Sequence, residues 1–457
     1  MPRKVFISFL GTNNYVQCRY DIHGVVSAPV RFVQEALIEH ICKDWTEEDR
    51  ILIFCTSKEK SGENGSKEIN WFDNGQSRIT DESEKIGLQH RLQDLQTRIG
   101  LKAQIEEHDI EAGFSEEEIW DIFDTVYAKL QFDDQIYFDV THAFRSIPLF
   151  SIVLFNYSKF MKDTRLVSIM YGAFEKLGAA FKVKEQPVEG RIAPVINLTN
   201  IARLQEYNQV ASELITFGRV KSISDSIYYK NDEASDDLCC LCEAIDELDE
   251  YIATIQLENI RHGEYVKRFH KYLQRMRDSG EIADASHPIT KILDKLEEEM
   301  SSFVPRDDIQ NIEAAIEWAN RHGMILQEYP LAEEYIIYRI VYVFHEKWSE
   351  YDISESDSRE IFASIMGMKD RDFDNMKLTD RVFQKDEIFP RFVRNTFPRN
   401  SVNATFIKEM KRCGYSELRL RRNSLAHANG KYSYQDLTDK FLDVYSNCID
   451  VICNFEN

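Results

Sequence analysis

Val5-Phe6-Ile7-Ser8-Phe9-Leu10, followed at once by Gly11-Thr12-Asn13-Asn14, is the stretch that decides the fold of the first half of the chain. A short apolar run of this kind is typical of a strand that is buried on both faces of a parallel sheet. The Gly-Thr-Asn-Asn cluster is a turn sequence, so the strand should end at Leu10. The stretch predicts a first parallel strand with a polar loop at its carboxyl end.

Similar runs recur along the first 198 residues and alternate with helical patterns. Further strands are predicted at residues 51–55, 103–107, 135–140 and 166–171. Residues 60–80 are expected to form a long loop, and residues 181–183 and 193–198 a hairpin that extends the sheet. Strands that alternate with helices predict a doubly wound α/β domain over residues 1–198.

A second polar cluster follows the strand at residues 135–140 and contains Thr141, His142 and Arg145. In doubly wound sheets, ligands bind beyond the carboxyl ends of the strands, and both polar clusters are predicted to lie there. Amides, hydroxyls and a guanidinium suit a phosphate-bearing ligand. His142 is either a ligand contact or a hydrogen-bonded structural residue. No third donor accompanies Asp139 and His142, so no metal site is predicted.

The second half of the chain, residues 199–457, has helical periodicity almost throughout and predicts an all-α domain. Loops are expected at residues 278–288 and 352–386, and a helix at about 403–428 that is broken at Gly414. Near the end of that helix stands Arg421-Arg422-Asn423-Ser424-Leu425-Ala426-His427. An imidazole transfers protons near neutral pH, and a guanidinium clamps a phosphate as charge develops on it.

The spacing of this motif sets a geometric condition. Five residues at about 100° each place Arg422 and His427 roughly 140° apart on an ideal helix. Two copies of the helix facing each other across a two-fold axis would supply both groups to one composite site. The alternative is that these arginines are solvated surface cations and that His427 is a helix-end residue favoured by the dipole.

Composition excludes several classes of protein. The chain has 457 residues and a net charge of −22, which argues against a general nucleic-acid coater. Basic residues nevertheless cluster near the motif, at Lys408, Lys411, Arg412, Arg419, Arg421 and Arg422. The nine cysteines have no disulfide or zinc spacing. No apolar run approaches the length of a membrane span, so a soluble, cytoplasmic protein without a membrane partner is expected.

Three motifs together resemble a known family. They are Ile-Ser-Phe-Leu-Gly-Thr-Asn-Asn-Tyr at 7–15, Asp-Val-Thr-His-Ala-Phe-Arg-Ser at 139–146 and Arg-Asn-Ser-Leu-Ala-His at 422–427. In this combination the chain resembles the CRISPR-associated CARF–HEPN proteins, the ancillary ribonucleases of type III CRISPR systems. The resemblance covers essentially the whole chain.

The resemblance implies an allosteric ribonuclease acting on single-stranded RNA. A Rossmann-like CARF domain, as a homodimer, would bind one cyclic oligoadenylate, with cyclic tetra-adenylate the expected activator. The positions that match its ligand loops are Gly11, Thr12, Asn13, Asn14, Thr141, His142 and Arg145. The helical HEPN domain would carry Arg422, Asn423 and His427 and would need no metal or other cofactor.

Two alternatives to this function remain open at the level of sequence. One is a nucleotide sensor whose helical domain docks a partner without cutting RNA. The other adds slow degradation of the ring within the α/β domain, with Thr141 or a neighbour assisting. The sequence leaves the ring size, the RNA base preference and any assembly beyond a dimer undecided.

Overall fold

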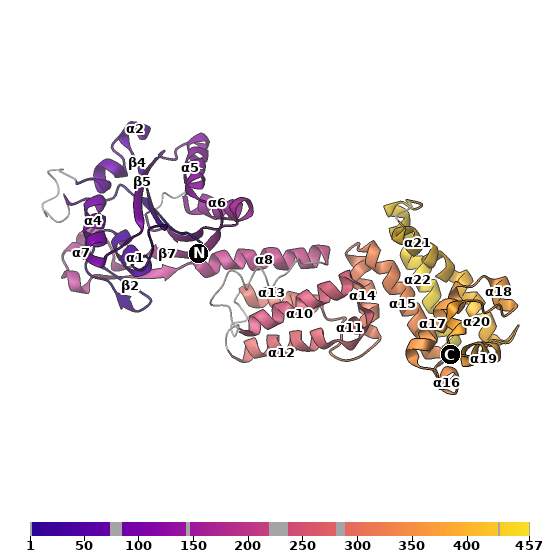
Figure 1. The fold of residues 1–457 in the computed structure, drawn as a ribbon. Helices are drawn as coiled ribbons and strands as arrows, with labels where there is room; N and C mark the ends of the chain where they lie inside the picture. Colours follow the sequence, from indigo (N-terminus) through magenta and orange to yellow (C-terminus); the bar gives the residue numbers. More distant parts are fainter. Residues whose placement is uncertain are drawn as a thin grey trace. The chain divides into compact units, whose positions relative to one another are not determined.

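Parallel strands dominate the first of two units into which the chain divides, Met1–Glu206 and Tyr207–Asn457. The computed structural model describes residues 2–73, 85–142, 147–218, 236–279, 288–427 and 430–456 (Figure 1). Within these residues the first unit holds an eight-stranded sheet of order β3-β2-β8-β7-β6-β1-β4-β5. The strands are β1 Lys4–Leu10, β2 Arg19–Ile22, β3 Val25–Val26, β4 Arg50–Thr56, β5 Gln104–Ile110, β6 Gln135–Asp139, β7 Arg165–Gly172 and β8 Ile192–Asn197.

The five strands β7, β6, β1, β4 and β5 are parallel and are covered on both faces. Figure 1 shows α1 and α4 on one side of the sheet, and α5 and α6 on the other. The main helices of this unit are α1 Val33–Ile41, α4 Leu88–Ile99, α5 Glu116–Lys129 and α6 Ile147–Lys162. Alternate residues of β1 enter the two cores, which explains why its apolar run is continuous.

The chain order reverses between β1 and β6. On one side of β1 lie β4 and β5, and on the other side lie β6 and β7. The register pairs Ser8 with Asp139, so the two strands end side by side. In doubly wound folds, ligands bind in a crevice at such a reversal, beyond the carboxyl ends of the strands.

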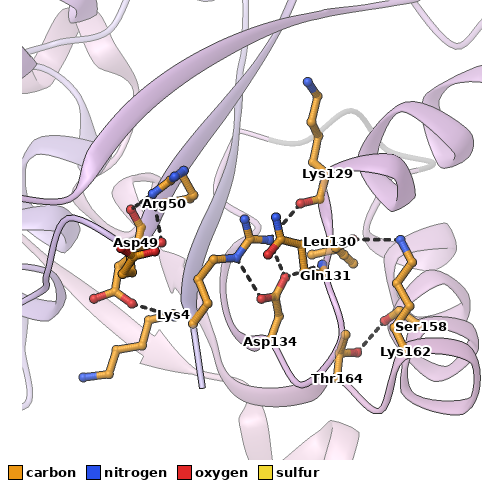
Figure 2. A network of polar contacts seen from close by, with 12 residues as sticks. Lys4, Asp49, Arg50, Lys129, Leu130, Gln131, Asp134, Ser158, Lys162 and Thr164 are labelled. Atoms are coloured by element: carbon orange, nitrogen blue, oxygen red, sulfur yellow. Dashed lines mark hydrogen bonds and ion pairs between the residues drawn. The ribbon is translucent and has the colours of Figure 1, made fainter. Parts of the chain in front are cut away.

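Charged groups tie the opposite, amino-terminal edge of the sheet together (Figure 2). Arg3 donates from Nε to the carboxylate of the fully buried Asp134 over 2.9 Å, which joins the start of β1 to the start of β6. Asp49 accepts the backbone N–H of Lys4 at 2.7 Å, and Lys162 donates to the Leu130 carbonyl at 2.8 Å. The strand starts are therefore bound to one another within the unit, and polar loops are left at the carboxyl edge.

Two predictions for this unit are wrong. Residues 181–183 lie in the short helix α7, Ala180–Lys184, in which Val183 is buried and Phe181 is 67% exposed. Three residues are too few to distinguish the strand period from the helix period. The sheet is extended instead by β8, antiparallel to β7, and by β2 and β3. The predicted loop at 60–80 contains a π-helical turn, η1, Lys67–Trp71, in its described part.

Short helices complete the first unit, and helices make up the described part of the second. The short helices are α2 Lys58–Ser61, η2 Phe174–Leu177 and η3 Val188–Gly190. The later helices are α8 Thr199–Phe217, α10 Asp236–Ala253, α11 Leu257–His262, α12 Glu264–Asp278, α13 Pro288–Glu299, α14 Gln310–Arg321, α15 Ile325–Val343, α16 His345–Ser349, α17 Glu355–Gly367, α18 Asp370–Asp374, η4 Arg381–Gln384, α19 Ile388–Thr396, α20 Val402–Met410, η5 Lys411–Tyr415, α21 Ser416–Ala426 and α22 Tyr434–Glu456. This confirms the predicted fold class, a doubly wound α/β domain followed by a helical one. The boundary expected at residue 198 lies just before α8, and the division after Glu206 falls inside that helix.

The predicted loop at 352–386 is wrong, because it contains α17, α18 and η4. Ser354 caps α17 by accepting the N–H of Asp357. Ile361, Phe362 and Ile365 are fully buried beneath an otherwise polar helix. The polar face dominates the composition of this segment, and this is why composition suggested a loop.

The predicted break at Gly414 lies within η5, where the backbone leaves helical geometry. Any side chain at this position would collide with the carbonyl of Val444 on α22. The close approach of α22 therefore requires glycine. The break sets the direction in which α21 leaves, and α21 carries the Arg-x4-His motif.

Candidate functional site

The loop after β1 presents three exposed polar side chains, those of Thr12, Asn13 and Asn14. Its backbone is held from below by Asn70 of η1, which donates to the carbonyls of Gly11 at 2.8 Å and Asn13 at 2.9 Å. Gly11 is buried, and a methyl group there would collide with the hydroxyl of Tyr15. The anchored backbone leaves the side chains at 12–14 free to face a ligand.

Asn70 is itself oriented by Arg31, a 2% exposed residue that precedes α1. Arg31 donates from Nη2 to Oδ1 of Asn70 at 3.1 Å. Because arginine is only a donor, the amide oxygen of Asn70 must face it and the amide nitrogen must face the loop. A buried cation therefore sets the position of the loop after β1 through one intermediate side chain.

A buried carboxylate organises the end of β6. Asp139 has no exposed surface and accepts three hydrogen bonds: from Ser8 Oγ at 2.7 Å, from Thr141 Oγ1 at 2.6 Å and from the Thr141 N–H at 3.0 Å. Gln34 of α1 donates to Ser8 Oγ at 3.0 Å. Burial raises the pKa of Asp139, and the donors from Thr141 and Ser8 oppose that rise. The network binds β1, β6 and α1 together directly below the loops.

Thr141 and His142, two of the predicted ligand residues, are close to the loop after β1. The hydroxyl of Thr141 accepts the N–H of Gly172 at 2.8 Å, so it is engaged on both sides. The ring of His142 packs on that of Tyr15, with 4.1 Å between centroids. Burial lowers the pKa of His142 to about 3, so its imidazole is neutral at physiological pH. Arg145 lies outside the described residues.

The predicted nuclease residues lie at the end of α21. Arg422 makes a bidentate ion pair with Glu333 of α15, from Nε to Oε2 at 2.6 Å and from Nη2 to Oε1 at 2.9 Å. Glu333 is 7% exposed, and the hydroxyl of Tyr415 also donates to it at 3.2 Å. The hydrogen bond from Arg422 to this carboxylate is the main cause that raises the pKa of Arg422. Sequence reasoning missed Glu333 because it lies 89 positions away from its partner.

Asn423 and His427 occupy the same last turns. His427 ends α21, donates its backbone N–H to the Asn423 carbonyl at 3.0 Å and is exposed. Arg421, by contrast, is buried, donates to the Asp436 carbonyl at 2.8 Å and pairs with Glu417. Of the two adjacent arginines, Arg421 is buried against α22, and Arg422 is partly exposed beside Glu333.

Three of the residues that support these sites had a partial signal in the sequence. Ser8 interrupts an apolar run, Asp139 ends a strand, and Glu333 stands in a mostly apolar helix. Each is a polar residue at a position that the pattern marks as buried, which requires a polar partner. Asn70 had no such signal, because its segment was interpreted as a loop.

The described ranges contain no group of three or more His, Cys, Asp or Glu side chains that could hold a metal ion. No described helix has both the length and the apolar composition needed to cross a bilayer.

The fold defines a class: a doubly wound α/β domain followed by a helical domain. No family model matches the chain. It is 29% identical over 198 residues to CRISPR-associated protein MJ1674 of Methanocaldococcus jannaschii, a match that covers 42% of this chain and 28% of that protein. The match supports the relationship to CRISPR-associated proteins that the motifs indicated. The chain thus spans little more than a quarter of this relative's length.

A solved structure also resembles the chain weakly. Enterococcus italicus Csm6 bound to cyclic hexa-2'-fluoro-hexa-dAMP aligns with a TM-score of 0.43 and 12% identity, over 100% of this chain and 94% of that one. A likeness at this level transfers nothing from that protein to this one.

Proposed function

We propose that the protein is an endoribonuclease that cleaves single-stranded RNA when a cyclic oligoadenylate binds its α/β domain, in type III CRISPR antiviral defence. The observation that carries the proposal is the pairing, in one chain, of polar loops at the β1–β6 reversal with a helix whose end bears Arg422 and His427. The second half of that pairing matters most, because imidazole with guanidinium is sufficient for RNA cleavage by internal attack.

In the proposed reaction the ribose 2′-oxygen forms a bond to the adjacent phosphorus, and the bond from phosphorus to the 5′-oxygen breaks. His427 takes the proton of the 2′-hydroxyl or delivers one to the departing 5′-oxygen. Arg422 stabilises the charge on the phosphorane with the N–H groups that Glu333 does not occupy. Asn423 binds the phosphate or orients the imidazole. The products are a 2′,3′-cyclic phosphate and a 5′-hydroxyl.

The proposed regulation is a population shift in a homodimer. A ring bound across the two-fold axis must bind the active dimer more tightly than the inactive one. On one helix, Arg422 and His427 point in different directions, so a single copy does not aim both at one phosphate. In a two-fold dimer, each composite site would receive Arg422 and His427 from two copies of α21. Cyclic tetra-adenylate is the activator we propose, and the cytoplasm is the compartment.

We do not propose ring cleavage as a second activity. The hydroxyl of Thr141 donates its proton to the buried Asp139 and accepts from the backbone of Gly172. It therefore has no proton left to give to a ring phosphate. Mass analysis of the ring after long incubation with the protein tests this, and the ring should remain intact.

The test of the main proposal is cleavage of a fluorophore–quencher RNA in EDTA, with cyclic tetra-adenylate or cyclic hexa-adenylate added separately. One ring should produce a signal, and His427→Ala should lower the rate by about 10²–10⁴-fold while leaving ring affinity unchanged. Silence with both rings, despite measurable ring binding, would favour a sensor that does not cut RNA. Cleavage by His427→Ala at the wild-type rate would overturn the assignment of the site.

A further inference from the structure

A groove of about 480 Å³ runs along α21 beside the proposed nuclease residues. One wall is the face of α21 formed by Ser416, Arg419, Leu420 and Asn423, which are spaced by three and four residues. The opposite wall comes from the end of α17 and the segment that leads into α18. Along α21 the groove extends from Ser416 to Asn423. Asn423 is the neighbour of Arg422 in the chain.

The described lining of this groove is basic. It carries four cationic side chains, those of Lys369, Lys411, Arg412 and Arg419, and one carboxylate, that of Asp370. The chain as a whole carries a net charge of −22, so a basic groove contrasts with the rest of the protein. Such a contrast directs a polyanion to one place on an otherwise repulsive molecule.

Lys411 is built into the wall and is not a surface lysine. It is 5% exposed, donates to the Met368 carbonyl at 3.0 Å and lies over the ring of Phe373, 4.9 Å from its centroid. The carboxylate of Asp370 is 4.0 Å away. Burial lowers the pKa of Lys411 to about 8, and the nearby cation of Arg419 adds to this fall, which Asp370 and Asp374 only partly oppose. An anion in the groove would supply further compensating charge.

Arg419 links the groove to the nuclease residues. Its Nε lies 3.9 Å from Oε1 of Glu333, the carboxylate that holds Arg422. Its guanidinium lies against Gly367, where any side chain would collide with it. The absence of a side chain at Gly367 makes room for this cation. Leu420, which is 54% exposed, adds an apolar surface to the same wall.

We propose that this groove binds the RNA strand next to the scissile phosphate, with Arg419 and Lys411 on a neighbouring phosphate and Leu420 under a base. Alternating cationic and apolar contacts are what single-stranded RNA requires, since it offers phosphates and unstacked bases together. The inference rests on the proposed ribonuclease function and adds to it the path of the substrate.

The experiment measures binding of labelled single-stranded RNA by the full-length protein carrying His427→Ala, at saturating ring, by fluorescence anisotropy over a range of salt. Arg419→Ala and Lys411→Met should each weaken binding by about tenfold. Each should also reduce the salt slope of log affinity by about 0.7, the value for one lost phosphate contact on a single strand. Arg391→Ala, which removes an exposed arginine on α19, is the matched control and should change neither quantity.

Two further measurements separate binding from folding. Gly367→Ala keeps Arg419 but displaces it, so it should weaken RNA binding in the same direction. Arg419→Lys keeps the charge and should restore part of the affinity. In the cleavage assay, the loss caused by Arg419→Ala should fall on KM rather than on kcat.

The outcomes distinguish the two proposals. If His427→Ala abolishes cleavage but Arg419→Ala and Lys411→Met bind RNA with the wild-type affinity and salt slope, the groove inference is overturned and the ribonuclease function stands. If the groove variants weaken RNA binding but no ring elicits cleavage, the nuclease proposal fails and the groove stands as an RNA site. If the protein with ring neither binds nor cleaves RNA, both fail.

Discussion

The crevice at the β1–β6 reversal and the end of α21 differ in the contacts that hold their polar groups in place. At the crevice, two strands that pair along their length bring their loops together, and a buried network below fixes both. At the end of α21, the guanidinium of Arg422 is held by a carboxylate of another helix, while His427 is exposed at the helix end. Sheet topology brings the first set of groups together, whereas an ion pair between two helices positions Arg422 in the second.

The two sites also handle buried charge differently. Asp139 accepts hydrogen bonds from neutral donors, Ser8 and Thr141, and these oppose the rise in its pKa that burial causes. Glu333 is stabilised by the cation of Arg422 and by the hydroxyl of Tyr415. A change at the first network should therefore act on stability and ring binding, and a change at the second should act on catalysis.

Among changes to the residues that support the two sites, the largest effect is expected from Glu333→Gln. The substitution replaces a bidentate charged pair with a weaker contact, and a guanidinium displaced by about 1 Å costs a catalytic site about 10²-fold. Single-turnover cleavage with ring should fall by about that factor. Glu334→Gln, which changes the adjacent residue that pairs with Arg359, is the matched control. A faster rate for Glu333→Gln would mean that Glu333 restrains Arg422 rather than orienting it.

A smaller effect is expected from Thr141→Val. The isosteric change removes one donor to the buried Asp139 and the acceptor of the Gly172 N–H. Leaving buried polar groups unpaired should lower the free energy of unfolding by about 1–3 kcal/mol. Urea unfolding followed by circular dichroism measures this loss. Thr97→Val, which removes an exposed hydroxyl on α4, should stay within about 0.5 kcal/mol of wild type. Equal stability of the two variants would show that the Asp139 network does not support the crevice.

The smallest effect is expected from Asn13→Ala and Asn14→Ala. Both side chains are exposed, so their loss should leave stability unchanged. Each should weaken ring binding by up to about tenfold, the value of one hydrogen bond to a ligand. Calorimetric titration with cyclic tetra-adenylate measures the change, with Gln93→Ala on the outer face of α4 as the control. Unchanged affinity in both variants would place the ring contacts elsewhere in the crevice.

Local signals in the sequence predicted local features well. Continuous apolar runs predicted β1 and β4, because burial on both faces leaves such stretches, and strands were also predicted where β5, β6 and β7 lie. Gly414 breaks its helix where predicted. Short elements gave too little pattern to interpret. The four-residue strand β2 was not predicted, and the five-residue helix α7 was predicted to be a strand.

By itself, the sequence determined the main parallel strands of the first unit, the polar loops at two strand ends and the Arg-x4-His spacing, because each depends on residues close together in the chain. Only the tertiary structure decided that the two loops meet, that Asn70 supports one of them, and that Glu333 holds Arg422. It also decided that Arg419 and Lys411 line one groove with Asn423. These contacts join residues far apart in the chain. The periodicity of apolar residues indicates only whether a side chain is buried, and it does not indicate which distant residue that side chain contacts.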